Sequence, residues 1–179
     1  IDEIKPNVSI VMPVYNGAKT IKKAIDSLLA QTFKDFELII SDNASDDETE
    51  NICRKFVSKD SRIHYIRQDK NIGLYQNFNF LLGKAAGKYF MFAAVDDWRS
   101  PEFLEVNVSA LERNKKFVAS TSPNCHEGEE NNPKKYINFN IEGNPKERFD
   151  KFLQNAWFSH GIIYSLMRTE VIKEYKYLD

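Results

Sequence analysis

Cysteine is scarce in this sequence, and no stretch of it is apolar for long. Cys53 and Cys125 are the only cysteines among 179 residues. Two are too few for a disulfide scaffold and their spacing fits no metal site, so we expect two free thiols. The best apolar run, SIVMPVY, is the size of a strand and far short of the roughly 20 residues that a membrane helix needs. The chain begins at Ile1 without an initiator methionine or a signal peptide, which predicts a trimmed or engineered piece.

Neither sign of charge is in excess. Lysine and arginine total 25, aspartate and glutamate total 26, and the net charge is −1. A protein that binds nucleic acid through its phosphates normally carries a basic excess, so that class of function is disfavoured. NAD binding is disfavoured as well, because no Gly-x-Gly-x-x-Gly follows the first apolar run. With 42% hydrophobic residues, the chain is long enough to bury the core of one ordinary globular domain.

Four apolar runs rich in β-branched and aromatic residues recur along the first half of the chain, with helical patterns between them. The runs are 8–14, 36–41, 62–67 and 88–95. Strands that alternate with helices imply right-handed crossovers, and continuously apolar strands imply a sheet covered on both faces. The sequence therefore predicts an α/β fold with a mostly parallel central sheet and helices on both faces.

Particular residues predict where several elements begin. Ser45, Asp46 and Asp47 resemble the capped start of a helix, so we expect the later two acids to be mostly structural. Ser100 followed by Pro101 predicts the start of another helix. After a polar loop at 122–135, we expect strands at 136–140 and 157–168, a helix at 145–154 with Phe149, Phe152 and Leu153 facing inward, and a last helix capped by Thr169.

Ligands of such folds bind beyond the carboxyl ends of the strands, so the chemistry is expected at 13–17, 42–47, 68–77 and 94–99. At the first of these, Tyr15 offers a flat face to a nucleobase. The alternative is a plain strand-to-helix turn without a binding role. At the second, the carboxylate of Asp42 can accept hydrogen bonds from a nucleobase N–H or a ribose hydroxyl. The basic residues of the third stretch could meet a diphosphate or simply form a polar loop.

The fourth apolar run leads directly into two adjacent acids, Asp96 and Asp97. Unpaired carboxylates side by side repel and raise each other's pKa. A divalent cation removes that conflict, and hard oxygen ligands suit magnesium or manganese. The alternative is a pair of solvated acids on a turn.

These pieces, in this order, resemble the family-2 glycosyltransferases, which have the GT-A nucleotide-diphospho-sugar transferase fold. The resemblance covers about 7–115 and rests on SIVMPVYNGAKTIKKAIDSLLAQTFKDFELIISDNASDDET and NIGLYQNFNFLLGKAAGKYFMFAAVDDW. The sequence departs from the family's common D-x-D-D element, because Ala94 stands where the first acid would be.

The resemblance implies a set of donor-site residues. The nucleotide would be bound by Pro13, Tyr15, Asn16, Asp42, Asn43, Arg67, Asn71, Gly73 and Asp96. Asp96 and Asp97 match the acidic element that contacts the ribose and a diphosphate-bound Mn²⁺ or Mg²⁺. His160 is a weaker metal candidate, since a lone histidine among apolar residues is more often a packed one.

The implied reaction moves a sugar from a nucleoside-diphosphate donor, UDP-linked in our interpretation, to an acceptor hydroxyl on a glycan or lipid-linked acceptor, with inversion. We expect one domain over 1–179, with 1–115 binding the nucleotide sugar and 116–179 starting a truncated acceptor part. The catalytic base is then expected beyond Asp179, so this piece would bind donor yet transfer poorly. The expected setting is bacterial surface polysaccharide synthesis in the cytoplasm or at the inner face of the plasma membrane. The alternative is a non-catalytic or truncated sugar-nucleotide-binding module.

Overall fold

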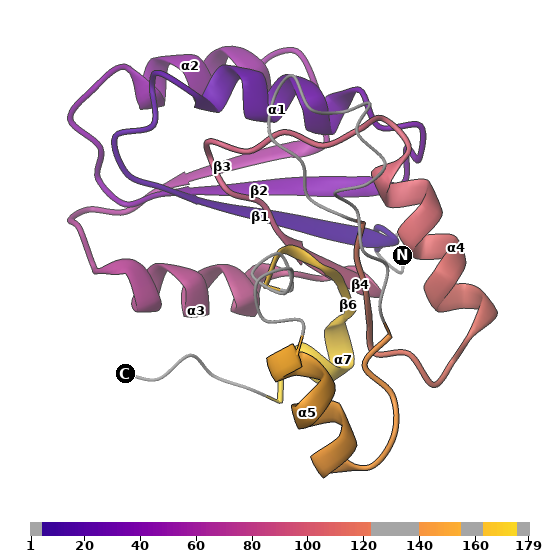
Figure 1. Cartoon of the computed structure of the whole chain (residues 1–179). Coiled ribbons are helices and arrows are strands. Elements are labelled where there is room, and N and C mark those ends of the chain that lie inside the picture. The colour runs from indigo at the N-terminus through magenta and orange to yellow at the C-terminus, as the bar shows by residue number, and fades with distance from the viewer. Residues whose placement is uncertain (1–4, 123–139, 155–162, 175–179) are drawn as a thin grey trace.

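A computed structural model describes residues 5–122, 140–154 and 163–174 of the chain (Figure 1). Strands and helices alternate through the first two thirds, as predicted. The strands are β1 (Val8–Val14), β2 (Phe36–Asp42), β3 (Ile63–Arg67), β4 (Tyr89–Phe92), β5 (Ala119–Ser120) and β6 (Leu166–Arg168). The helices are α1 (Ile21–Leu29), α2 (Thr49–Val57), α3 (Leu74–Lys84), α4 (Phe103–Arg113), α5 (Pro145–Gln154) and α7 (Thr169–Ile172).

The strands form a single sheet with the order β3-β2-β1-β4-β6-β5. The first four strands are mutually parallel, and β6 runs antiparallel to both β4 and β5. The register places Val14 opposite Asp42 and Asp42 opposite Arg67, so the carboxyl ends of β1, β2 and β3 are level. Their outgoing loops emerge together on the left of Figure 1. The predicted mostly parallel α/β sheet is confirmed.

Helices cover both faces of this sheet. Helices α1, α2 and α4 pack on one face, where the apolar stripe of α1 (Ile21, Ala24, Ile25 and Leu28) is buried against β1, β2 and β4. Helix α3 packs on the other face, where Leu81 and Leu82 meet Phe90 and Phe92. Because β1 and β4 are buried on both sides, their sequences are continuously apolar rather than alternating.

The cysteine prediction is confirmed for the one cysteine that the structure describes. Cys53 is a buried free thiol on α2. Burial, with Asp42 and Asp47 adding negative charge, raises its pKa to about 12. Cys125 lies outside the described residues, as do His160, Asp179 and almost all of the predicted loop at 122–135.

Several predicted element ends were wrong. The fourth strand ends at Phe92 rather than at residue 95, and α4 begins at Phe103 rather than at Pro101. Ser100 does not cap α4 with its side chain; its carbonyl oxygen accepts the Phe103 N–H instead. Thr169 is the first residue of α7 rather than its cap. Of the predicted strand at 157–168, the described part is strand only at Leu166–Arg168.

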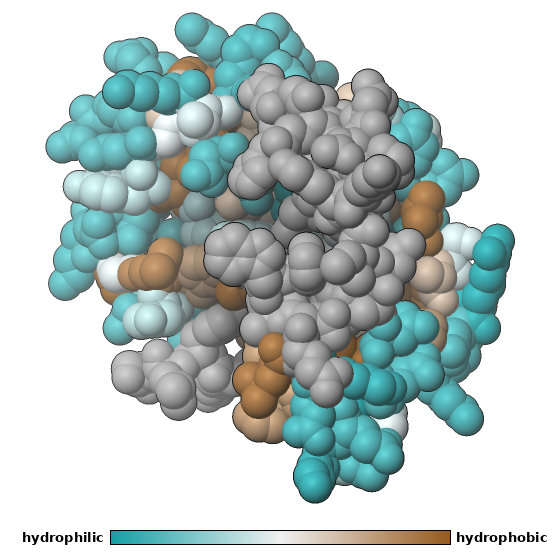
Figure 2. All heavy atoms as spheres, in the orientation of Figure 1, coloured by the Kyte–Doolittle hydropathy of each residue, from teal (hydrophilic) through white to brown (hydrophobic). Residues whose placement is uncertain are grey.

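Helix α5 exists as predicted, but its apolar side chains do not face inward. Phe149 is 60% exposed, Phe152 40% and Leu153 54%. Hydrophobic atoms accordingly show on the surface over α5 in the lower part of Figure 2. The prediction failed because an amphipathic stripe shows which face of a helix is apolar but not whether another element covers it, and α5 belongs to neither buried cluster of the described residues.

Within the described ranges, no helix combines the length and the apolar character that crossing a bilayer requires.

Candidate functional site

The turn after β1 and the loop after β2 are interlocked by hydrogen bonds. Three successive backbone N–H groups of the turn donate to side chains of the loop and of the start of α2: Asn16 N to Ser45 Oγ at 2.8 Å, Gly17 N to Thr49 Oγ1 at 2.9 Å, and Ala18 N to Asp47 Oδ2 at 3.0 Å. In return, the Asp46 N–H donates to Asn16 Oδ1 at 3.0 Å. These bonds hold Asn16 in a left-handed conformation (φ 54°) and fix the turn that carries Tyr15, whose side chain is half exposed.

Asp47 carries much of this interlock. Its Oδ1 accepts from the N–H of Thr49, the first residue of α2, at 2.9 Å, and from the Thr49 hydroxyl at 2.5 Å. Desolvation by itself would raise the pKa of Asp47, but the hydrogen bonds from Thr49 and Ala18 outweigh it and hold the pKa below its usual value. These contacts support the expectation that Asp47 is structural.

Asp42 lies at the last position of β2 with a carboxylate that is completely buried. Its Oδ1 accepts the Ser45 N–H at 2.8 Å. Its Oδ2 accepts the Tyr65 hydroxyl at 2.5 Å and Nη1 of Arg67 at 3.1 Å. Arg67 also donates to the Ser45 carbonyl oxygen at 2.8 Å, so the guanidinium bridges β2 and its following loop. A nucleobase could reach this carboxylate only if one of its hydrogen-bond partners moved. Among these partners Arg67 is the most exposed, with a third of its side chain accessible.

Asn43 joins the second loop to the third. Its Nδ2 donates to Asn71 Oδ1 at 2.9 Å and to the Gly73 carbonyl oxygen at 3.3 Å, while its Oδ1 accepts the Ile72 N–H at 2.8 Å. Asn71 Oδ1 also accepts the Gly73 N–H at 2.9 Å. Three residues that the sequence predicted as nucleotide contacts, Asn43, Asn71 and Gly73, are therefore brought into one hydrogen-bonded group beside Asp42.

Gly73 has backbone angles (φ 87°, ψ 163°) that only glycine adopts readily. We expect Gly73→Ala to lower the free energy of unfolding by about 2 kcal/mol, because a Cβ atom is strained in this region. Urea denaturation measures the change. Gly83→Ala is the matched control: no atom lies within 4 Å of its added Cβ, so there we expect a small gain of about 0.5–1 kcal/mol within α3. Equal effects at the two positions would contradict the strain at Gly73.

The two acids after β4 lie on an exposed turn next to the first loop. A Cβ atom on Gly17 would come within 2.7 Å of Val95 Cγ2, which places the segment just before Asp96 against the turn after β1. Both carboxylates are exposed, and Arg99 Nη1 lies 3.6 Å from Asp97 Oδ2. All the predicted donor-site residues in the described ranges therefore lie at the carboxyl edge of the sheet.

The acid pair suits a magnesium or manganese ion held jointly with a phosphate group. Nowhere in the described part of the chain do three or more histidine, cysteine, aspartate or glutamate side chains form a metal-binding group. Sites of Mg²⁺ commonly use one or two carboxylates together with substrate phosphates and water. Two exposed carboxylates on one turn match that donor set.

Sequence reasoning missed three residues of this region: Tyr65, Arg99 and Tyr164. Tyr65 lies on β3 and donates to Asp42. Arg99 has only 12% of its side chain exposed and packs 5.9 Å from the ring centre of Tyr164. Burial, and then the charges of Asp97 and Asp96, raise the pKa of Tyr164. Alternation along β3 could have indicated Tyr65, but no local pattern links Tyr164 to a turn so far away in the sequence.

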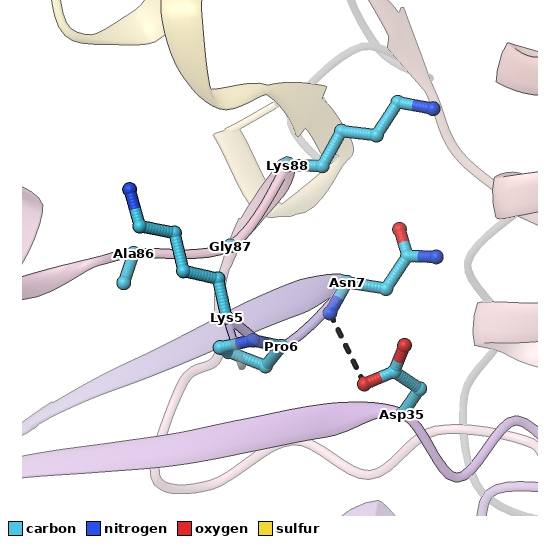
Figure 3. Close-up of a pocket in the computed structure, with 7 residues that line it drawn as sticks. All are labelled: Lys5, Pro6, Asn7, Asp35, Ala86, Gly87 and Lys88. Atoms are coloured by element: carbon cyan, nitrogen blue, oxygen red, sulfur yellow. Dashed lines mark hydrogen bonds between the residues drawn. The ribbon is translucent and has the colours of Figure 1, made fainter. Parts of the chain in front are cut away.

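A shallow pocket of about 370 Å³ lies at the opposite edge of the sheet, where the strands begin (Figure 3). Figure 3 shows Asn7 and Asp35 side by side, joined by a hydrogen bond from the Asn7 N–H to Asp35 Oδ1 of 3.2 Å. The lining residues are Lys5, Pro6, Asn7, Asp35, Ala86, Gly87 and Lys88. None of them is a predicted site residue, so this pocket is separate from the candidate site.

Known proteins resemble this chain in part of its sequence or in its fold. A GlyA glycosyltransferase of Streptococcus pneumoniae is 33% identical over 102 residues, which are 57% of this chain and 14% of GlyA. The structure of S. aureus TarS 1–349 in complex with UDP-GlcNAc matches with a TM-score of 0.71 at 20% identity, covering 94% of this chain and 47% of that one. The mannosyltransferase PcManGT from Pyrobaculum calidifontis, in complex with GDP-Man and Mn²⁺, matches with a TM-score of 0.66 at 17% identity, covering 96% and 47%.

This chain spans less than half the length of each of these proteins. The fold likeness confirms the predicted GT-A architecture. The family described as Glycosyl transferase family 2 matches residues 9–176, which is nearly the whole chain. This chain belongs to glycosyl transferase family 2.

Proposed function

We propose that this chain binds a nucleoside-diphosphate sugar, UDP-linked, at the carboxyl edge of its sheet. The observation that carries the proposal is that the loops after β1, β2 and β3 and the acid turn after β4 meet at one edge. The nucleotide site consists of Pro13, Tyr15, Asn16, Asp42, Asn43, Arg67, Asn71, Gly73 and Asp96. The TarS complex contains UDP-GlcNAc, whereas the PcManGT complex contains GDP-Man. The fold is therefore compatible with more than one nucleobase and sugar, and the choice of uracil is part of our proposal.

Each group of residues has a distinct part in donor binding. The exposed face of Tyr15 packs against the base. The group formed by Asp42, Asn43 and Arg67 fixes the backbone that surrounds the base and ribose. Asp96 and Asp97 would hold Mn²⁺ or Mg²⁺, which would act as a Lewis acid toward the charge on the departing diphosphate. His160, outside the described residues, stays a weaker candidate for the same region.

The proposed reaction is an inverting transfer. An acceptor hydroxyl oxygen forms a bond to the anomeric carbon, the bond from that carbon to the diphosphate oxygen breaks, and the hydroxyl proton passes to an aspartate or glutamate base. A base of this kind contributes about 10²- to 10⁴-fold in rate. We propose that 1–115 is the donor-binding part and that the acceptor part begins at 116, with its base beyond Asp179. No described residue is given that role.

The setting we propose is synthesis of a surface polysaccharide or other glycan, in the cytoplasm or at the inner face of the plasma membrane. The acceptor is then a glycan or a lipid-linked sugar. The alternative is a module that binds a sugar nucleotide without transferring the sugar. Donor titration cannot separate the two, whereas a transfer assay on a longer form of the protein can.

Calorimetric titration of UDP and of GDP, each with and without Mn²⁺, tests donor binding directly. We expect UDP to bind only with the cation present. Mn²⁺ alone should bind at least about tenfold more weakly than Mn²⁺ with UDP, because two carboxylates leave most coordination positions to phosphate and water. Preference for GDP would overturn the choice of uracil as the nucleobase but would leave the proposed site unchanged. Failure of both nucleotides to bind the folded chain would overturn the proposed function.

A further inference from the structure

A buried cation lies directly behind the acid turn. Arg99 has 12% of its side chain exposed, and its guanidinium carbon lies 5.4 Å from the ring centre of Phe103 and 5.9 Å from that of Tyr164. Its backbone N–H donates to Ser27 Oγ on α1 at 3.2 Å. The side chain is therefore held between α4 and the segment that precedes β6, and it cannot swing into solvent without disrupting that packing.

The hydrogen bonds of this guanidinium are incomplete. Nη1 donates to the Trp98 carbonyl oxygen at 3.1 Å and lies 3.6 Å from Asp97 Oδ2, longer than a good charged hydrogen bond. Nε is buried, and no described residue accepts its hydrogen. Leaving a charged donor unpaired is costly. Burial lowers the pKa of Arg99, but a guanidinium stays protonated at neutral pH.

We propose that Arg99 is a positioning residue that makes cation binding at Asp97 depend on the nucleotide. This inference rests on the proposed function. The positive charge near Asp97 Oδ2 orients that carboxylate and repels a divalent cation that arrives alone. With a diphosphate present, the added negative charge more than offsets the charge of the divalent cation, so Arg99 no longer opposes its binding.

The charge count supports this coupling. Asp96, Asp97 and Arg99 together carry a net charge of −1. A divalent cation alone reverses that charge, whereas a cation with a diphosphate leaves it negative. Because coupling between two ligands is reciprocal, Arg99 should strengthen the effect of Mn²⁺ on UDP affinity and of UDP on Mn²⁺ affinity by the same factor.

Mn²⁺ binding followed by electron paramagnetic resonance, with and without saturating UDP, tests the inference without an activity assay. For Arg99→Gln we expect Mn²⁺ alone to bind about tenfold more tightly than to the unchanged chain. A charge within about 4–6 Å of an ionised group changes an equilibrium constant about tenfold or more. The factor by which UDP improves Mn²⁺ binding should fall by a similar amount. Arg113→Gln, an exposed position at the end of α4, is the matched control and should change neither value.

Arg99→Lys separates positioning from packing. Lysine keeps the charge but not the planar guanidinium. The Arg99→Lys chain should therefore bind Mn²⁺ alone almost as weakly as the unchanged chain does. If Arg99 only packs the core, glutamine and lysine will lower thermal stability together and neither will tighten Mn²⁺. Unchanged Mn²⁺ affinity in a folded Arg99→Gln chain overturns the inference. That result leaves the proposed function standing if the unchanged chain still binds UDP with Mn²⁺.

Discussion

Asp97→Ala is expected to weaken the binding of UDP in the presence of Mn²⁺ by about 100-fold, equivalent to about 2.7 kcal/mol. Asp97 supplies one of the two exposed carboxylates on the acid turn, and no third acid joins them among the described residues. Removing one of two protein ligands leaves the cation held by Asp96 and the diphosphate. Calorimetric titration of UDP with and without Mn²⁺ measures the loss.

The control for this experiment is Asp26→Ala. Asp26 is also exposed, with 49% of its side chain accessible, but its carboxylate pairs with Lys22 one turn earlier on α1. We expect its removal to leave UDP affinity unchanged. The sequence also allowed Asp96 and Asp97 to be two solvated acids on a turn, and their exposure agrees with that alternative as well. Equal UDP binding by Asp97→Ala and Asp26→Ala would establish it and remove the metal from the proposed site.

The parallel part of the fold, β1 to β4 with α1 to α3, could be predicted from the sequence because its signals are local. The stripe of α1 repeats every three to four residues, and the mostly apolar runs at β1 and β2 are buried over almost their whole length. The parallel order then brings Asp42 and Asn43 to the same edge as the turn after β1 without further information. Local periodicity and topology suffice for this part.

The rest of the site depends on contacts between distant segments. Arg99 packs against Tyr164, and Tyr65 donates to Asp42 from a neighbouring strand. The sequence places each of these residues in an element but does not say what lies opposite. The same reason explains α5: the spacing of Phe149 and Phe152 predicts a helix, and only the packing of other elements decides whether that face is covered.

Asp42→Ala is expected to lower the free energy of unfolding by about 3 kcal/mol. The change removes the acceptor for the Ser45 N–H and the Tyr65 hydroxyl and leaves Arg67 only its longer pair with Glu50, from Nε to Oε2 at 3.4 Å. Breaking a buried ion pair by removing one partner costs about 3–5 kcal/mol, and the lower end applies because water reaches the exposed third of Arg67. Urea denaturation followed by circular dichroism gives the value.

Tyr65→Phe is the matched comparison, because it deletes one donor to the same oxygen and leaves the carboxylate and Arg67 paired. We expect it to cost about 1 kcal/mol, the usual value of one hydrogen bond. Under the proposed function, UDP affinity should fall in the same order as stability. Asp42→Ala should lose at least tenfold more UDP affinity than Tyr65→Phe, since the carboxylate fixes both Arg67 and the loop around the base, whereas the hydroxyl only orients the carboxylate. If the two variants bind UDP alike while differing in stability, Asp42 stabilises the fold without taking part in nucleotide recognition.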